Sequence, residues 1–319
     1  MAKKFHIRLS LLGIISSLLL VAPASWSDTK NGFQLDNALV PVKEIHKGGP
    51  PRDGIPSLDN PRFVRADKAS YLKDKYRVLG VAIDGIAHAY PIRILNYHEI
   101  VNDVVGGKAV VITYCPLCGS GTVFGRTVNG RRLEFGVSGL LYNSDVLMYD
   151  RQTNSLWSQL MSQAISGRMQ GERLVQLPAS HTSWQEWTSR HPQTTVLSDD
   201  TGFRRNYRMD PYPNYGSDGR LYFPVSHSSN EYRRKEPVMG LEVDGKFKAY
   251  AFKELSKGAP RFKDEFGGIE FLVEFDKEHE TARILNADGD ELPTTIAYWF
   301  AWYAFHPETE VFRAPQDDG

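Results

Sequence analysis

The chain repeats itself, and this duplication constrains its fold more than any other feature. The stretch RVLGVAIDGIAHAYPIRIL, residues 77–95, matches PVMGLEVDGKFKAYAFKEL, residues 237–255. In both copies an Asp-Gly pair separates two β-rich runs, because the pair supplies the positive φ angles of a tight hairpin. Each copy is therefore predicted to form a strand, a turn, a second strand and a short helix.

Two further blocks match in the same order along the chain. Residues 102–114 match 263–275, and residues 183–197 match 298–312. The first pair predicts a turn before a β-branched strand, and the second predicts a short helix that stops before a proline, then a strand. Three matched blocks in the same order along the chain indicate an internal duplication. We predict a strand-dominated α+β fold of two internally duplicated β-rich halves with short helices.

Composition divides the rest of the chain around these halves. The expected parts are a signal peptide, an arm rich in Gly, Pro and Asp, the two halves, a loop-like linker and a tail. Their predicted bounds are 1–27 for the signal peptide, 28–60 for the N-terminal arm, 61–200 for the first half with its insertion, 201–221 for the linker, 222–313 for the second half and 314–319 for the tail.

The first 27 residues have the order of a secretory signal. Lys3, Lys4 and Arg8 precede the apolar run LSLLGIISSLLLVA, and small residues then offer cleavage after Ala24 or Ser27. A membrane anchor is the less favoured alternative because the apolar run is short for a bilayer span. We predict a periplasmic or secreted protein with no stable membrane span after cleavage.

Charge and motifs exclude several classes of partner. The chain has 38 basic and 38 acidic residues, and the first 27 residues hold three of the basic ones and no acidic one. The rest of the chain has 35 basic and 38 acidic residues, and this balance gives no electrostatic basis for binding nucleic acid. The chain lacks a P-loop, a GxGxxG after a strand, a GxSxG elbow and HExxH, so no nucleotide cofactor is expected.

The two cysteines of the chain, Cys115 and Cys118, lie in YCPLCGSG of the first half. The second half has Asp276 and His279 there, so this box is a better functional candidate than residues that both copies keep. Gly119 replaces the histidine that attachment of a c-type haem would need. The glycine-rich, β-like continuation lacks the helix that lowers a thiol pKa in thioredoxin-like dithiols. CPxCG resembles the metal-binding knuckle of rubredoxins and zinc ribbons.

Our leading interpretation is a metal site at Cys115 and Cys118 with His98, from the predicted helix in RILNYHEIVND, as third ligand. An exposed or N-cap-like histidine without a metal is an equally open interpretation of His98. Two thiolates with an imidazole favour copper or zinc, and the site would be redox-active in one version of this interpretation. Two alternatives remain, a metal-free thiol–disulfide oxidoreductase and a ligand-binding module with a structural disulfide. The sequence does not decide whether the protein is an enzyme.

A polar set in the insertion is a candidate site for a small polar ligand. It comprises Ser138, Tyr142, Asn143, Asp145, Asp150 and Arg151. The Asp-Arg pair is equally typical of a solvated turn or a structural ion pair, so that alternative stays open.

Four segments together resemble one known family. NYHEIVND, YCPLCGSG, FGVSGLLYNSDVLMYDRQTNSLWSQL and HPQTTVL are similar to the bacterial family catalogued as domain of unknown function 3179. The resemblance covers roughly residues 50–313. It implies family membership and no particular reaction.

Overall fold

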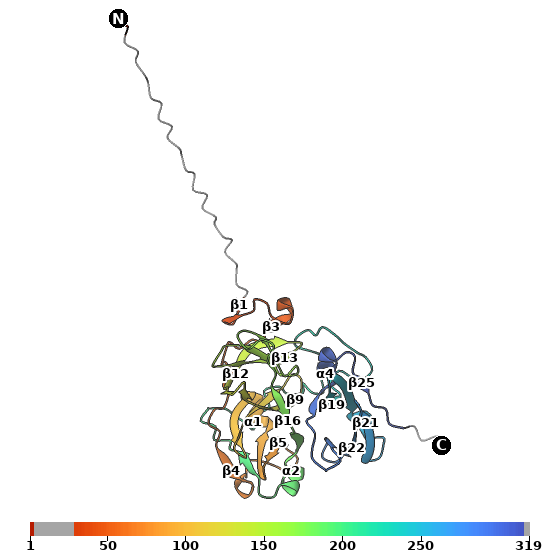
Figure 1. Ribbon diagram of the computed structural model, residues 1–319. Helices are drawn as coiled ribbons and strands as arrows, with labels where there is room; N and C mark the ends of the chain where they lie inside the picture. The colour runs from red at the N-terminus through yellow and green to blue at the C-terminus, as the bar shows by residue number, and fades with distance from the viewer. Residues whose placement is uncertain (3–28, 316–319) are drawn as a thin grey trace.

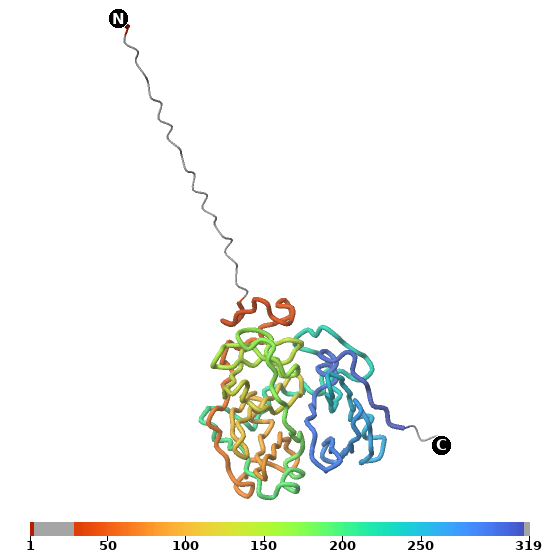
Figure 2. The backbone as a smooth tube through the Cα atoms, viewed as in Figure 1, coloured from red at the N-terminus to blue at the C-terminus, as the bar shows by residue number. Residues whose placement is uncertain are grey.

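The computed structural model describes residues 1–2 and 29–315, shown as a ribbon in Figure 1 and as a backbone tube in Figure 2. Apart from residues 1–2, the predicted signal peptide and its cleavage position lie outside the described residues. None of the described helices has the length and apolar character that crossing a bilayer requires.

Short strands dominate the described fold, as the sequence predicts. The matched elements of the first half are β5 (Arg77–Ile83), β6 (Ile86–Pro91), α1 (Ile92–His98), β7 (Ile100–Val105), β8 (Lys108–Cys115), β9 (Ser120–Gly125), β17 (Ser180–Ser183), α2 (Trp184–Arg190) and β18 (Thr195–Leu197). Those of the second half are β19 (Pro237–Val243), β20 (Lys246–Ala251), α3 (Phe252–Leu255), β21 (Arg261–Phe266), β22 (Ile269–Asp276), β23 (Thr281–Leu285), β24 (Thr295–Tyr298), α4 (Trp299–Phe305) and β25 (Glu310–Val311).

The matched strands also pair in the same order. The first half has the order β17-β5-β6-β18 and the second half has β24-β19-β20-β25. Gly80 pairs with Ser180 in the first half, and Gly240 pairs with Thr295 in the second. In both copies the last strand pairs in parallel with the second strand of the hairpin. The predicted duplication is therefore visible in topology and register, while the exact bounds of the two halves stay a prediction.

A tryptophan packed on a strand glycine fixes each copy. A Cβ atom on Gly80 would lie 2.3 Å from the Trp187 ring, and one on Gly240 would lie 2.1 Å from the Trp302 ring. Each indole N–H donates to a threonine hydroxyl seven residues later, at 2.9 Å in the first copy and 3.0 Å in the second. Only glycine allows the ring to lie this close to the strand, so this contact sets the position of α2 and α4.

The two halves share one sheet. Its order is β25-β20-β19-β24-β9-β8-β7, with β16 (Val175–Leu177) also pairing with β9. The joint is the pairing of β24 with β9, where Ile296 lies opposite Gly121. Figure 1 shows the second half, in blue, beside the first along this line. The turn after β8, which carries both cysteines, therefore lies where the halves meet.

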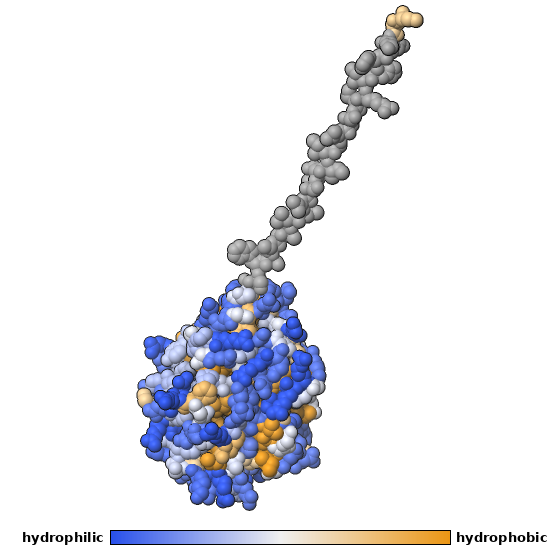
Figure 3. All heavy atoms as spheres, turned by 90° about the vertical axis from the view of Figure 1, so that its left-hand side faces the viewer, coloured by the Kyte–Doolittle hydropathy of each residue, from blue (hydrophilic) through white to orange (hydrophobic). Residues whose placement is uncertain are grey.

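The insertion forms a sheet of its own with part of the N-terminal arm. This sheet contains β12 (Phe135–Tyr142), β13 (Asp145–Asp150), β14 (Leu156–Ser158), β15 (Gln163–Ser166) and β3 (Ile45–Lys47). The remaining elements are β1 (Thr29–Lys30), β2 (Phe33–Gln34), β4 (Phe63–Arg65), β10 (Thr127–Val128), β11 (Arg131–Arg132) and the 3₁₀ helices Val42–Glu44 and Ala66–Lys68. The arm buries Phe33, Leu35 and Ile45 against this sheet, so it is part of the packed fold. On the face drawn in Figure 3, hydrophilic residues cover most of the surface.

The tryptophan–glycine contact predicts a specific loss of stability. Gly80→Ala and Gly240→Ala should each lower the free energy of unfolding by about 3 kcal/mol, because the new methyl group overlaps an indole ring that cannot move freely. Urea unfolding followed by tryptophan fluorescence measures this change. Gly219→Ala is the control, since its Cβ would meet no atom within 4 Å. Equal midpoints for all three variants would contradict the packing argument.

His306 predicts a loss of stability in mild acid. Its ring stacks on Phe247 with centroids 3.8 Å apart, and burial, followed by the charge of Arg173, lowers the pKa of His306 to about 3. Unfolded histidine titrates near pH ~6.5, so between these values the unfolded chain binds a proton that the folded chain does not. Stability is therefore full above about pH 6.5 and falls as the pH drops toward 3.

The variant His306→Phe should keep the stacking and remove this dependence. Between pH 7 and pH 5 we expect the wild type to lose about 2 kcal/mol more than the variant, measured by urea unfolding at both pH values. His191→Phe, at the matching position with a more exposed ring, should have a smaller effect. Identical losses in the wild type and His306→Phe would show that folded and unfolded His306 bind protons equally, which would contradict a lowered pKa in the fold.

Candidate metal centre

The CPLC box forms the turn of a hairpin between β8 and β9. Cys115 pairs with Ser120 across the hairpin, and the Cys118 N–H donates to the Cys115 carbonyl at 3.2 Å. Gly119 has φ +59°, which glycine adopts without strain. A strand follows the box, as predicted, in place of the helix of a thioredoxin-like site. Both cysteines are free, and their exposed fractions are 2% and 0%.

A second hairpin turn, from the insertion, meets the first one at the sulfurs. Asn143 and Ser144 connect β12 to β13 with φ of 50° and 64°, and Asp145 follows as the first residue of β13. The Ser144 carbonyl accepts from the Cys118 thiol at 3.4 Å and lies 3.8 Å from the Cys115 sulfur. One carboxylate oxygen of Asp145 and the two sulfurs all lie within 4.8 Å of one another. Two turns that are distant in sequence thus place three ligand atoms together.

The Asp145 carboxylate is only half satisfied. Its Oδ2 accepts from the Leu160 backbone N–H at 3.1 Å, whereas its Oδ1 is buried without a hydrogen-bond partner among the described residues. Burial raises the pKa of Asp145 to about 7, partly offset by the hydrogen bonds it accepts. Buried polar atoms in folded proteins nearly always have a partner, so the free oxygen indicates a binding position.

Both thiols are poor nucleophiles in this environment. Burial is the main cause that raises the pKa of Cys115 and of Cys118, and the nearby Asp145 charge adds to it. A reactive cysteine needs a lowered pKa and some exposure to solvent. The site therefore has the opposite character to that of a thiol–disulfide oxidoreductase, and a cation between the sulfurs is what would favour their deprotonation.

Glu99 adds a second carboxyl group to this region. It follows α1 with φ +57°, its backbone carbonyl accepts from the Tyr114 N–H at 2.8 Å, and its side chain is buried. Burial, followed by the charge of Asp145, raises the pKa of Glu99 to about 8. Within the part of the chain that the structure describes, neither Glu99 nor Asp145 forms an ion pair. The region therefore holds two buried carboxyl groups, neither of which is paired with a cation of the described residues.

Apolar side chains enclose the three ligand atoms. The cluster that contains the two cysteines also contains Leu117, Leu141, Val146, Leu160, Tyr215, Phe300 and Ala301. Phe300 and Ala301 come from α4 of the second half, and the Tyr298 N–H at the end of β24 donates to the Cys118 carbonyl at 2.8 Å. Both halves and the connection between them therefore enclose the site.

The sequence profile of one family, described as a protein of unknown function (DUF3179), matches residues 52–291. The chain belongs to the DUF3179 family. The matched region includes β8, β9 and the whole insertion, and so every residue of the Cys-Cys-Asp group. Neither the curated proteins nor the solved structures include a match to this DUF3179 chain.

The sequence predicts His98 as the third ligand. The structure does not place it with the two cysteine sulfurs. Its Nδ1 is hydrogen bonded to the Pro56 carbonyl at 2.7 Å and its Nε2 to the Tyr207 hydroxyl at 2.5 Å. Both ring nitrogens are thus used within the fold, and the histidine is absent from the group that surrounds the sulfurs. These contacts fit a structural role for His98, and Asp145 is the residue whose carboxylate groups with the two sulfurs as a candidate third ligand.

The polar residues predicted to bind a small ligand do not gather at one place. Ser138 donates to a backbone carbonyl of β13, Asn143 donates to the Ala304 carbonyl at 3.3 Å, and the Tyr142 ring packs against Phe305. These contacts hold the hairpin of the insertion and dock it on α4. Binding of a small ligand by this set stays a prediction.

Asp150 and Arg151, at the far end of β13, also have local partners. Asp150 accepts from the Trp157 indole at 3.0 Å and from the Thr153 hydroxyl at 2.7 Å. Arg151 donates to Asp59 at 2.7 Å, so the Asp-Arg pair forms the structural contacts that the sequence leaves open. Of the six residues in the set, Asp145 is the one that lies at the sulfurs. Its sequence signal was YNSD, a turn that the first half alone contains.

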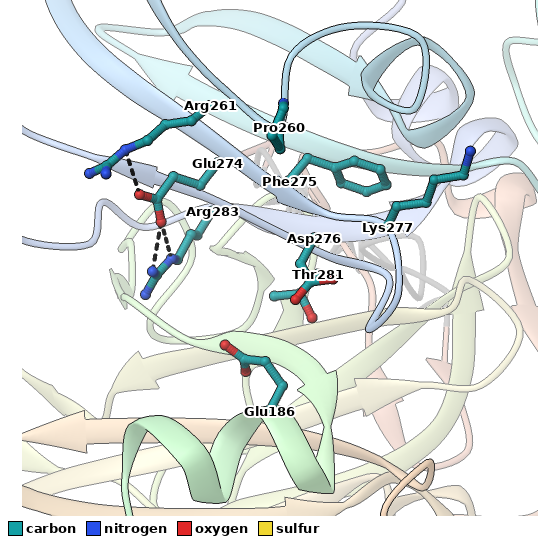
Figure 4. Close-up of a pocket in the computed structure, with 9 residues that line it drawn as sticks. All are labelled: Glu186, Pro260, Arg261, Glu274, Phe275, Asp276, Lys277, Thr281 and Arg283. Carbon is teal, nitrogen blue, oxygen red and sulfur yellow. Dashed lines mark hydrogen bonds and ion pairs between the residues drawn. The ribbon is translucent and has the colours of Figure 1, made fainter.

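A separate cavity of about 420 Å³ lies between the halves, away from the cysteines (Figure 4). Its walls are β21 to β23 on one side and Glu186 of α2 on the other. Glu274 accepts from Arg261 at 2.9 Å and lies 2.6 Å from Arg283, as the dashed lines show. These three charges are already paired with one another within the second half, so they are not free to bind a ligand in the cavity.

The burial of the two thiols predicts slow labelling. After treatment with a chelator, the native protein should react with a disulfide reagent such as DTNB at pH 8 far more slowly than the same protein in guanidinium chloride, where both thiols should react. The physical reason is that burial excludes the reagent and raises the pKa of both thiols. A stopped-flow absorbance trace measures the rate. Equally fast labelling of native and unfolded protein would contradict the buried site.

Proposed function

We propose that this DUF3179 protein binds one divalent metal ion, with zinc as the favoured ion, through Cys115, Cys118 and Asp145. The observation that carries the proposal is the meeting of three buried ligand atoms, two sulfurs and one carboxylate oxygen of Asp145, within 4.8 Å of one another. Thiolate sulfur and carboxylate oxygen are both common zinc ligands, with bond lengths of about 2.3 Å and ~2.0–2.2 Å. Three protein ligands leave one position of a tetrahedral ion open.

Charge and ligand type favour zinc over Cu(I). Two thiolates and a carboxylate carry three negative charges in a buried region, and a divalent ion neutralises more of that charge than a monovalent one. Cu(I) favours soft sulfur ligands, whereas zinc accepts sulfur and oxygen together. A ligand set with Asp145 in place of the predicted His98 is harder, because a carboxylate is a harder ligand than an imidazole. The harder set favours zinc over Cu(I).

We further propose that the protein works outside the cytoplasm, in the periplasm or as a secreted protein. The support is the sequence of the first 27 residues, in which a basic start, an apolar run and small residues follow one another. In an oxidising compartment a free Cys-x-x-Cys pair would be exposed to disulfide formation. A bound ion would hold both sulfurs as ligands and protect them, which links the proposed compartment to the proposed site.

The test is metal binding by protein that has been stripped with a chelator. Wild-type protein should take up about one zinc ion per chain, measured by elemental analysis after gel filtration and by competition with a chromophoric chelator. Asp145→Asn and Cys118→Ser should each weaken the affinity by more than about a hundredfold, since loss of an outer-shell partner alone costs roughly 10–100-fold. Removal of either ligand leaves the ion without enough protein ligands.

His98→Gln is the matched control, because it removes a buried polar residue of the same half that lies outside the ligand group. We expect its metal content to equal that of the wild type, whereas a loss as large as that of Asp145→Asn would reinstate His98 as a ligand. Wild-type protein that binds neither zinc nor cobalt above the level of Cys118→Ser would rule out the metal site.

A further inference from the structure

A segment between the two halves lies over the candidate metal centre. We call residues 207–225 the covering segment. Its Tyr215 belongs to the same buried cluster as Cys115 and Cys118, and its Phe223 carbonyl accepts from the Ser144 hydroxyl at 2.8 Å. The segment therefore contacts both the cysteine cluster and the hairpin turn that carries Ser144.

Lys235 fixes the middle of the covering segment. Its ammonium group donates to the carbonyls of Tyr215 at 2.6 Å and Arg220 at 2.7 Å, and it lies 3.2 Å from the centroid of the Tyr215 ring. This cation is buried and its donors are used by the covering segment. It holds the Tyr215 ring in place, and it is not paired with any acidic group of the site.

The Tyr215 hydroxyl is a buried polar group with no partner among the described residues. The side chain is 3% exposed, and no hydrogen bond to its hydroxyl exists in that part of the chain. Tyr215 packs in the same buried cluster as Cys115 and Cys118, so its unpartnered hydroxyl lies within the enclosure that surrounds both sulfurs. Asp145 Oδ1 is a second buried polar atom without a partner, beside the same sulfurs.

An ion on the three ligands would satisfy Asp145 and would still leave the Tyr215 hydroxyl without a partner. Its fourth tetrahedral position would also be open. A neutral oxygen ligand at that position solves both problems. An anionic ligand, the Tyr215 phenolate included, would add a fourth negative charge to a buried region where three already exceed the charge of a divalent ion.

We propose that the Tyr215 hydroxyl holds a water molecule as the fourth ligand of the metal ion, within hydrogen-bond distance and beneath the covering segment. This inference rests on the proposed function. Tyr215 is then a positioning residue, and the ligand that the site accepts from solution is a small neutral oxygen donor. An open position with an exchangeable water is the arrangement of zinc ions that do chemistry, whereas four protein ligands are typical of structural zinc.

Cobalt(II) is the probe, because its visible spectrum reports ligand number and its unpaired electrons speed the relaxation of water that exchanges from the ion. Cobalt-loaded wild type should relax bulk water protons faster than the zinc-loaded protein does. Tyr215→Phe should keep its cobalt content, shift the visible bands and exchange water about tenfold faster, the factor that corresponds to one hydrogen bond of about 1.4 kcal/mol.

Two control variants separate the hydroxyl from the segment. Tyr222→Phe makes the same change in a neighbouring exposed ring, 4.7 Å from that of Tyr215, and should leave spectrum and exchange unchanged. Lys235→Met should loosen the covering segment and speed removal of the ion by a chelator, while the hydroxyl remains and the visible bands stay in place. A merely structural Tyr215 would instead make Tyr215→Phe resemble Lys235→Met.

The outcomes distinguish this inference from the metal site itself. Cobalt-loaded wild type with no exchangeable water, or a Tyr215→Phe variant with unchanged bands and unchanged exchange, would overturn the role of Tyr215 and leave the metal site intact. Wild type that binds no cobalt would overturn the metal site, and this inference with it.

Discussion

The packing of an indole ring directly on a strand glycine is the contact on which each half depends. It places the helix after the strand at one distance and one angle, because a side chain at the glycine would fill the space of the ring. The same contact in both copies gives two similar sheets, and β24 of one then pairs with β9 of the other. That joint defines the surroundings of the CPLC turn. The candidate metal centre therefore depends on scaffold contacts that contain no ligand.

The centre combines features that would be unfavourable in an ordinary protein core. Two thiols and two carboxyl groups lie close together in a buried region, and neither carboxyl group forms an ion pair among the described residues. Burial is the largest cause that raises the pKa of each of these groups, and an apolar core of the same size would not have this cost. Departures of this kind are concentrated where proteins bind or react. A divalent ion on the proposed ligands would favour deprotonation of both thiols and would pair the buried Asp145 carboxylate.

Much of the fold could be predicted from the sequence, because its signals are local. The Asp-Gly turns, the alternation of the strands and the repeated blocks identify the hairpins and the duplication without any knowledge of distant contacts. The CPLC box could also be identified as the exceptional feature of one copy. The ligand set could not be completed in this way. Asp145 is brought to the cysteines by the meeting of two hairpin turns, and His98 is turned away by a hydrogen bond to Tyr207 from a distant loop. Tertiary contacts of this kind leave no periodic trace in a sequence.

The hydrogen bond from Tyr298 to the Cys118 carbonyl has a consequence for how the two copies differ. One backbone N–H of the second half holds the very turn whose counterpart in that half contains no cysteine. The second copy thus has no need to retain the chemistry of the first in order to serve it. The second half thus contributes backbone and packing contacts to the cysteine turn without a cysteine of its own. The two halves therefore have similar folds but different contributions to the site. The first half carries the cysteines, and the second half supports the turn that contains them.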